Sequence, residues 1–307
     1  MGRRKGAPIN GWLNVDKPLG LTSSQVVGKL KRAFGAAKVG HGGTLDPLAS
    51  GVLPIAFGEA TKVINFVVDA RKRYRFTVRW GEARSTDDAE GPVVATSPVR
   101  PSEAAIRAAL SGFLGSIEQV PPRFSALKVE GQRAYDLARA DELVELPPRR
   151  VAIHELVLAG VPDLDHAEFE VACGKGTYVR SLARDVAVAL GTVGHVAALR
   201  RLAVGGFRAE AAIKLDLLTG FGHSPAAFER LLPILTPLDD IPAVAVTGAE
   251  AELIRNGQAV PASSLGPTGR PLPFREGDVV SVTAGEQPVA MARIDSGQLR
   301  PVRVFNL

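Results

Sequence analysis

A glycine-rich stretch near the N-terminus constrains this chain more than any other feature. Residues 38–62, KVGHGGTLDPLASGVLPIAFGEATK, hold five glycines and the pair Asp46–Pro47 before an apolar run from Val52 to Phe57. Glycine lets the backbone bend tightly and approach a ligand, because it has no Cβ. Pro47 favours an extended conformation at Asp46. The pattern predicts a rigid loop that presents Asp46 and leads into a strand; Asp-Pro and Gly-Gly are equally common in ordinary turns.

Composition bounds the class of protein. The chain has 307 residues, of which 46% are hydrophobic, and this length suggests about two domains. Cys173 is the single cysteine, which excludes an intrachain disulfide and a cysteine metal cluster and indicates a reducing compartment. The basic N-terminus has no apolar stretch behind it, and no run is long enough to cross a membrane. We therefore expect a cytoplasmic protein that is not held in a membrane.

The positive charge is unevenly distributed. The net charge is +5, but residues 1–40 carry eight lysines and arginines against one acid, Asp16. Further basic clusters lie at residues 71–73, 149–150 and 200–201. A polyanion such as a nucleic acid is one interpretation of these clusters. Solvated surface faces are the other, and charge alone leaves the choice open.

Periodicity and capping signals predict the elements beside the loop. Thr22 and Gln25 form a capping box for a helix that stops near Gly35. Residues 73–80 alternate cleanly, so Tyr74 shares one face of a strand with three further aromatic or aliphatic side chains. Its hydroxyl is placed to reach a cleft, although a core aromatic has the same spacing.

A second glycine turn, at residues 174–176, precedes a further predicted helix. Thr177 follows the turn as the expected N-cap, which places Tyr178 and Arg180 in the first helical turn. A helix N-terminus favours anions, and an arginine there strengthens that preference. The alternatives are a packing role for Tyr178 and a solvated surface position for Arg180.

The C-terminal part of the chain has a different character. Residues 219–240 are rich in proline and glycine and show little periodicity, as expected for a linker or a domain surface. Short strand-like segments between turns follow, which predicts a small β-rich domain of the barrel kind. We therefore divide the chain into residues 8–238 and residues 239–307.

Several kinds of chemistry leave no trace in the sequence. It has no P-loop, no dinucleotide-binding fingerprint and no metal-binding histidine pair, and its five histidines are scattered. We expect no metal site. The acidic segment 84–91 lacks the ligand spacing of a calcium loop. The candidate chemistry is a single carboxylate, Asp46, with cationic and aromatic groups near it.

Five motifs, in order, resemble a known family. Residues 40–53, GHGGTLDPLASGVL, are similar to the catalytic-loop signature of the TruB family, the bacterial tRNA pseudouridine-55 synthases. Four further stretches agree with it: DKPLGLTS at 16–23, KRYR at 72–75, GTYVR at 176–180 and LRRL at 199–202. The resemblance covers roughly residues 10–218, and the tail from about residue 239 resembles the PUA domain of that family more loosely.

The resemblance implies a fold and an activity. The fold would be α+β, a pseudouridine-synthase domain with a mixed, largely antiparallel sheet and flanking helices, followed by a small β-barrel PUA-like domain. The activity would be isomerisation of the T-loop uridine, U55, to pseudouridine, with base flipping and without a cofactor. The partner would be the T-stem-loop of tRNA; no protein partner is implied, and we expect a monomer.

The resemblance also implies catalytic residues. Asp46 matches the catalytic aspartate, which acts at the ribose of the target uridine either by attacking C1′ or by taking a proton from C2′. Arg180 matches the arginine that pairs with this aspartate, and such a charge-assisted pair would keep it ionised. Tyr74 matches the tyrosine that stacks on the target base.

Four further residues match substrate-binding positions of the family. His41 matches the histidine that lies against the flipped nucleotide, and Tyr178 and Leu199 match residues that line the uridine pocket. Lys17 falls in a motif that supports the catalytic loop. Two rival functions remain open at this point: a non-catalytic module that binds or folds tRNA, and a carboxylate-dependent hydrolase of another nucleoside.

Overall fold

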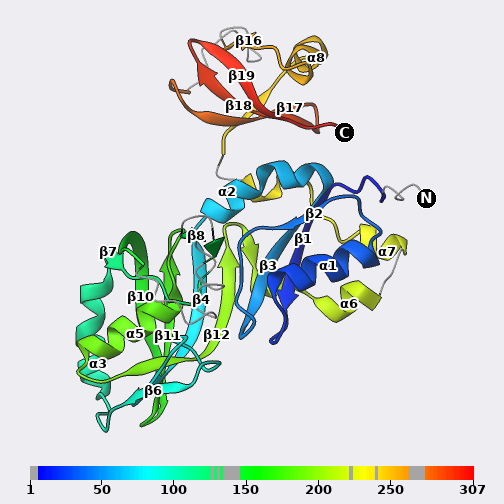
Figure 1. Cartoon of the computed structure of the whole chain (residues 1–307). Helices are drawn as coiled ribbons and strands as arrows, with labels where there is room; N and C mark the ends of the chain where they lie inside the picture. Colours follow the sequence, from blue (N-terminus) through cyan, green and yellow to red (C-terminus); the bar gives the residue numbers. More distant parts are fainter. Residues whose placement is uncertain are drawn as a thin grey trace.

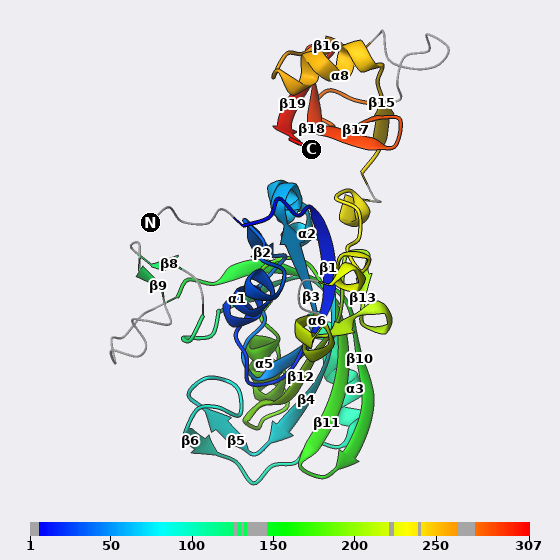
Figure 2. The same ribbon diagram turned by 90° about the vertical axis from the view of Figure 1, so that its right-hand side faces the viewer.

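Two β-sheets organise the chain (Figures 1 and 2). The computed structural model describes residues 6–125, 128–129, 132–133, 146–220, 224–238, 241–262 and 274–307. The larger sheet belongs to the part before residue 215 and the smaller one to the part after residue 242. The expected division between residues 238 and 239 falls at residues 239–240, which lie outside the described residues.

The larger sheet has ten strands in the order β14-β1-β3-β12-β4-β11-β10-β7, with β13 on β12 and β2 on β3. Only the pairs β1–β14 and β3–β12 are parallel among its described strands. The strands are β1 Gly11–Lys17, β2 Val39–His41, β3 Ala49–Phe57, β4 Lys72–Trp80, β7 Gly115–Gln119, β10 Arg149–Asp163, β11 His166–Cys173, β12 Gly194–Val204, β13 Phe207–Arg208 and β14 Ile213–Lys214. This is the mixed, largely antiparallel sheet that was expected.

Helices α1, α3, α5 and α6 cover one face of this sheet and share a core with its strands (Figure 1). Val67 of α2 packs in a separate core with Trp12 of β1, Val52 of β3 and Phe305. The helices are α1 Ser23–Ala33, α2 Ile64–Asp69, α3 Glu103–Leu110, α5 Val179–Ala189, α6 Leu215–Gly220 and α7 Pro225–Phe228, with 3₁₀ turns at Gly58–Val63, Ser111–Phe113, Ala209–Ala211 and Thr236–Leu238. Two small hairpins join β5 Glu82–Arg84 to β6 Val93–Thr96, and β8 Lys128–Val129 to β9 Gln132–Arg133.

Local sequence signals account for α1 and β4. The Thr22 hydroxyl accepts the Gln25 N–H at 3.1 Å, and the Gln25 side chain accepts the Thr22 N–H at 2.8 Å, so the predicted capping box is present. In β4 the predicted aromatic and aliphatic face is buried. On the opposite face, Arg73 and Arg75 pair with glutamates of β10 and β11, so part of the cluster at 71–73 is neutralised.

The helix after the second glycine turn begins one residue later than expected. Thr177 is not the N-cap; its hydroxyl donates to the carbonyl of Gly174 at 3.2 Å and closes the turn. Tyr178 is the N-cap, in an extended conformation and without a side-chain cap. The Gln119 amide accepts the Tyr178 N–H at 2.8 Å and donates to its carbonyl at 3.1 Å. These two bonds hold the Tyr178 backbone extended, so α5 starts at Val179.

The C-terminal sheet is a curled half-barrel in the order β15-β17-β18-β19-β16, packed against α8 Gly248–Arg255. Its strands are β15 Ala243–Ala245, β16 Val260–Pro261, β17 Val279–Ala284, β18 Gln287–Asp295 and β19 Gln298–Val304. Lys62 donates to the carbonyl of Val304 at 2.7 Å, and the Asn306 N–H donates to Glu59 at 2.7 Å. The sheet therefore lies against the 3₁₀ turn before α2.

No helix in the described ranges combines the length and the hydrophobicity that a membrane crossing requires.

Candidate active site

A pocket of about 300 Å³ opens between the glycine-rich loop, β4, β12 and the start of α5. Five of the seven predicted site residues line it: Asp46, Tyr74, Tyr178, Arg180 and Leu199. Its other lining residues are Gly43, Thr44, Leu45, Val68, Lys72, Gly174, Lys175, Gly176, Thr177, Val179 and Arg201. Elements separated by more than 130 residues of sequence thus meet at one cavity.

The loop that carries Asp46 is anchored on both sides. The Ser23 hydroxyl, from the first turn of α1, accepts the Leu45 N–H at 2.8 Å and donates to the Leu45 carbonyl at 3.1 Å. On the other side of Asp46, the Pro47 carbonyl accepts the Gly20 N–H at 2.8 Å. Asp46 is therefore presented by a fixed loop, and its side chain keeps 35% of its surface exposed.

Arg201 anchors the glycine-rich loop through its backbone carbonyls. Its side chain is 1% exposed, and it donates to the carbonyls of Gly43 at 3.0 Å, Thr44 at 3.2 Å and Val52 at 2.7 Å. Gly51 stands opposite Arg201 in the parallel pairing of β3 and β12, and a Cβ there would overlap the Arg201 backbone. Close pairing of these strands thus requires glycine at position 51.

Arg180 lies between two carboxylates. Its Nε is 3.0 Å from Asp46 Oδ2, and its Nη1 is 3.3 Å from Asp88 Oδ2. The guanidinium also donates to the carbonyls of Thr86 and Phe124, each at 2.9 Å. Its side chain is only 5% exposed, so the alternative of a solvated surface residue does not hold. The Nε–H is not aligned as a hydrogen bond to Asp46, and the contact is an ion pair.

Asp88 and its loop are a feature that the sequence interpretation missed. Segment 84–91 was considered only as a calcium loop, yet Asp88 is 2% exposed and also accepts the Thr86 hydroxyl and the Glu90 N–H. Asp87, at φ 59°, pairs with Arg184 of α5 at 2.8 Å. Burial raises the pKa of Asp87, and the neighbouring arginines oppose that rise. Two arginines of α5 thus clamp this loop beside the pocket.

Tyr74, Tyr178 and Leu199 form the less polar wall. Tyr74 is 9% exposed and Leu199 7%, and both line the pocket from neighbouring strands. Burial raises the pKa of both tyrosines, although the positive charge of Arg201 acts in the opposite direction on Tyr74. Both phenols therefore stay neutral at pH 7. A planar aromatic ring beside an aliphatic side chain suits the binding of a flat, uncharged nucleobase.

Two predicted residues do not line the pocket. Lys17 is fully buried, and its ammonium donates to the carbonyls of Pro18, Leu21 and Pro47 at 2.9, 2.6 and 3.4 Å. Lys17 therefore binds the backbone of the loop and does not line the pocket. His41 ends β2, and burial together with nearby Arg201 lowers its pKa, so the ring is neutral at pH 7.

Lys72 is a pocket residue that the sequence interpretation named only within a basic cluster and the KRYR motif, without a role at the site. It donates to the carbonyls of Val68 and of Ala70, and burial lowers its pKa to about 8. The signal was present in the sequence, because Lys72 is in phase with Tyr74 on the buried face of β4.

The described residues contain no group of three or more histidine, cysteine or acidic side chains that could bind a metal ion. The pocket instead brings together one partly exposed carboxylate, the buried guanidiniums of Arg180 and Arg201, the Lys72 ammonium and two phenols. Such a set can act as a nucleophile or base toward a neutral, planar substrate.

Comparison with known families decides the relationship. Residues 31–179 match the N-terminal domain of the TruB family of pseudouridylate synthases, and residues 180–241 match the C-terminal domain of tRNA pseudouridylate synthase B. A Rhodospirillum rubrum protein named tRNA pseudouridine synthase B is 55% identical over 305 residues, with 99% of each chain covered. The chain belongs to the TruB family. A Bradyrhizobium diazoefficiens protein of the same name is 54% identical over 310 residues, covering 99% of this chain and 88% of that one.

Solved structures support the fold. One is an H/ACA RNP bound to a substrate RNA containing 2′-deoxyuridine, with a TM-score of 0.75 and 22% identity; the match covers 100% of this chain and 92% of the other. A second is a Cbf5-Nop10-Gar1 complex, with a TM-score of 0.73, 25% identity and coverage of 96% and 84%. The expected pseudouridine-synthase fold is therefore confirmed.

Proposed function

We propose that this chain isomerises the T-loop uridine of tRNA, U55, to pseudouridine. The name tRNA pseudouridine synthase B, carried by relatives that match 99% of the chain, supports this reaction. The observation that carries the proposal is the ion pair of Asp46 with buried Arg180 at the wall of a pocket lined by Tyr74 and Leu199. A module that only bound RNA would have no use for a carboxylate held in this way.

The reaction keeps every atom of the base except one hydrogen. The N1–C1′ bond of uridine breaks, the uracil turns, and C5 bonds to C1′. The hydrogen on C5 leaves as a proton and N1 takes up a proton, and any bond formed between Asp46 and C1′ breaks when C5 bonds to C1′. No electron is gained or lost, so the proposed reaction needs no cofactor. Asp46 begins it, either by attacking C1′ or by taking a proton from C2′. The ion pair with Arg180, at 3.0 Å, holds the carboxylate in a fixed position and aims it at the ribose.

The base must leave the folded RNA before it can react. Flipping a nucleotide out of its stack costs a few kcal/mol, and stacking on an aromatic ring returns about 1–3 kcal/mol. We assign this stacking to Tyr74, because its buried ring lines the pocket. Tyr178 and Leu199 would keep the detached uracil in place while it turns.

Lys17 and His41 have different places in this proposal. We assign Lys17 to the support of the catalytic loop, since its ammonium is buried and bonded to the Pro47 carbonyl. His41 would lie against the flipped nucleotide; its Nδ1 is buried and has no hydrogen-bond partner among the described residues.

The domain division belongs to the same proposal. Residues 8–238 would carry the chemistry, and residues 239–307, with a core of their own in the five-stranded sheet, would add a PUA-like RNA-binding surface. We further propose that the enzyme acts as a monomer in the cytoplasm.

Release of tritium from tRNA labelled with [5-³H]uridine tests the reaction, because the C5 hydrogen is expelled only when pseudouridine forms. We expect release by the wild type and none by Asp46→Asn, with tRNA binding retained by the variant. Free uracil among the products would instead indicate a nucleoside hydrolase, and tight binding without release by either protein would indicate a non-catalytic module.

A further inference from the structure

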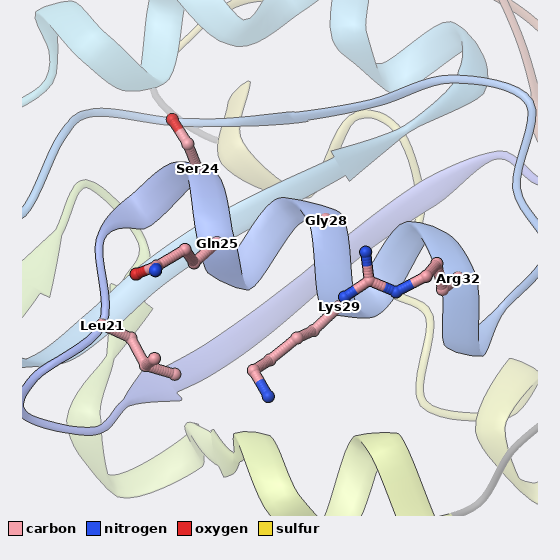
Figure 3. Close-up of a pocket in the computed structure, with 6 residues that line it drawn as sticks. All are labelled: Leu21, Ser24, Gln25, Gly28, Lys29 and Arg32. Carbon is pink, nitrogen blue, oxygen red and sulfur yellow. The ribbon is translucent and has the colours of Figure 1, made fainter.

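A second hollow lies along α1, away from the candidate active site. Leu21, Ser24, Gln25, Gly28, Lys29 and Arg32 line it, and it shares no lining residue with the pocket at Asp46. Figure 3 shows the Lys29 and Arg32 side chains extending from the helix, with the Arg32 guanidinium folded back toward Gly28. We call this hollow the α1 groove.

The charges of α1 are not neutralised within the described structure. Lys29, Lys31 and Arg32 are exposed, α1 contains no acidic residue, and none of the three has a carboxylate within 4 Å among the described residues. Part of the other basic clusters is paired: Arg200 makes two contacts with Asp16 at 2.9 and 3.0 Å. Arg71 and Arg149 stay exposed without a carboxylate within 4 Å among the described residues. Helix α1 differs from these single positions because it carries three such charges within four residues.

Gly28 gives the groove its depth. A glycine inside a helix makes the helix less stable than an alanine would, so its presence calls for a reason. Packing does not supply one, because a Cβ at this position would meet only Arg32 Nη1, at 3.9 Å, among the described atoms. Attraction of Arg32 to the C-terminal end of the helix dipole explains a charge there, but it does not explain a missing side chain one turn earlier.

The groove is held at a fixed distance from Asp46. The first turn of α1 is bonded to the catalytic loop through Ser23 and Leu45. A rise of 1.5 Å per residue places Arg32 about 14 Å along the helix axis from Ser23. Charges on a flexible arm would not keep a fixed distance from Asp46 in this way. An RNA whose uridine occupies the pocket could reach these charges with its phosphates.

We propose that the α1 groove binds the sugar-phosphate backbone of the same RNA molecule whose uridine enters the pocket, an inference that rests on the proposed function. Lys29 supplies a point charge to one phosphate, and the Arg32 guanidinium supplies paired donors to another. Ser24 and Gln25 offer polar groups to the ribose hydroxyls. Gly28 lets the backbone of the RNA approach the helix.

The test is salt-dependent binding of a full-length tRNA transcript to the intact chain, measured by fluorescence anisotropy between about 50 and 200 mM KCl. Three variants separate the causes: Lys29→Ala with Arg32→Ala removes the groove charges, Gly28→Leu fills the groove without a change of charge, and Lys31→Ala removes an exposed charge of α1 that does not line the groove. Thermal unfolding followed by circular dichroism checks that each variant is folded.

We expect the double variant to raise Kd about tenfold and to lower the slope of log Kd against log salt by about 1.5, because each phosphate contact contributes about 0.7–0.9 to that slope. Gly28→Leu should raise Kd at least about threefold at unchanged slope, while Lys31→Ala should change Kd less than about twofold. The effects should appear in KM, not in kcat.

Two results would overturn the proposal. In the first, the double variant matches Lys31→Ala in Kd and in slope. In the second, Gly28→Leu binds tRNA as tightly as the wild type, which would mean that α1 attracts RNA only through its overall charge and not through a groove. Tritium release by the wild type is scored separately. A wild type that binds RNA through the groove but releases no tritium would refute the proposed function and leave the groove in place.

Discussion

Replacing Arg180 by lysine should show that the shape of the guanidinium, and not only its charge, serves the reaction. The guanidinium contacts Asp46 through Nε, Asp88 and the Thr86 carbonyl through Nη1, and the Phe124 carbonyl through Nη2. A lysine keeps the charge but carries all of its donors on one nitrogen. A lysine ammonium that stays in contact with Asp88 and the Thr86 carbonyl therefore loses the ion pair with Asp46.

The expected fall in rate can be worked out from the ion pair with Asp46, because this is the interaction that bears on the reacting carboxylate. Arg180 is buried and Asp46 is partly exposed, so this ion pair should contribute more than the roughly 0.2–1 kcal/mol of a surface pair and less than the roughly 3–5 kcal/mol lost when a buried pair is broken, that is about 1.5–3 kcal/mol. Since about 1.4 kcal/mol corresponds to a factor of ten in rate, turnover should fall roughly 10- to 150-fold. A lysine also removes the hydrogen bond from the guanidinium to the Phe124 carbonyl, which should lower the free energy of unfolding by about 0.5–1.5 kcal/mol.

Single-turnover tritium release at saturating tRNA measures the first effect, and unfolding in guanidinium chloride measures the second. Arg184→Lys is the matched control, because Arg184 lies one turn along α5 and pairs with Asp87, not with Asp46. The control should lose stability with little loss of rate. If Arg180→Lys turned over within about threefold of the wild type, Arg180 would have no part in orienting Asp46.

Three further changes probe the pocket. Asp88→Asn should slow tritium release about tenfold at unchanged tRNA affinity, because Arg180 loses its second carboxylate; an unchanged rate would remove Asp88 from the network. Tyr74→Phe should keep most of the turnover and Tyr74→Leu should lose it through about 1–3 kcal/mol of stacking, so equal rates would contradict a stacking role. Burial lowers the pKa of Lys72 to about 8, so between about pH 8 and 10.5 the unfolded chain binds more protons than the folded one. As the pH rises through this window, the free energy of unfolding of the wild type should therefore increase relative to that of Lys72→Met. A difference in free energy of unfolding that stays constant across the window would refute this.

The sequence could predict what short-range signals determine. The capping box at Thr22 and the alternation through Tyr74 depend on neighbours within a few residues, and both appear in the structure. The glycine-rich loop does precede a buried strand, β3, as its pattern indicated.

Long-range pairing was beyond the sequence. Arg200 and Arg201 looked alike as a basic pair, yet Arg200 pairs with Asp16 on β1 while Arg201 is buried under the catalytic loop. Alternation from Leu199 could have indicated that position 201 faces inward, but its partners follow from the parallel pairing of β12 with β3. Asp88 was equally hidden, since its partner Arg180 is on α5.

The measurement that tests the central claim most directly is tritium release from [5-³H]uridine-labelled tRNA, with the wild type and Asp46→Asn compared in parallel and tRNA binding measured for both. The carboxamide keeps the size of the side chain and removes its charge, so the fold and the affinity should be kept. Release by the wild type, none by the variant and similar affinities are the expected results. Equal release by the two proteins would show that Asp46 does not carry the reaction.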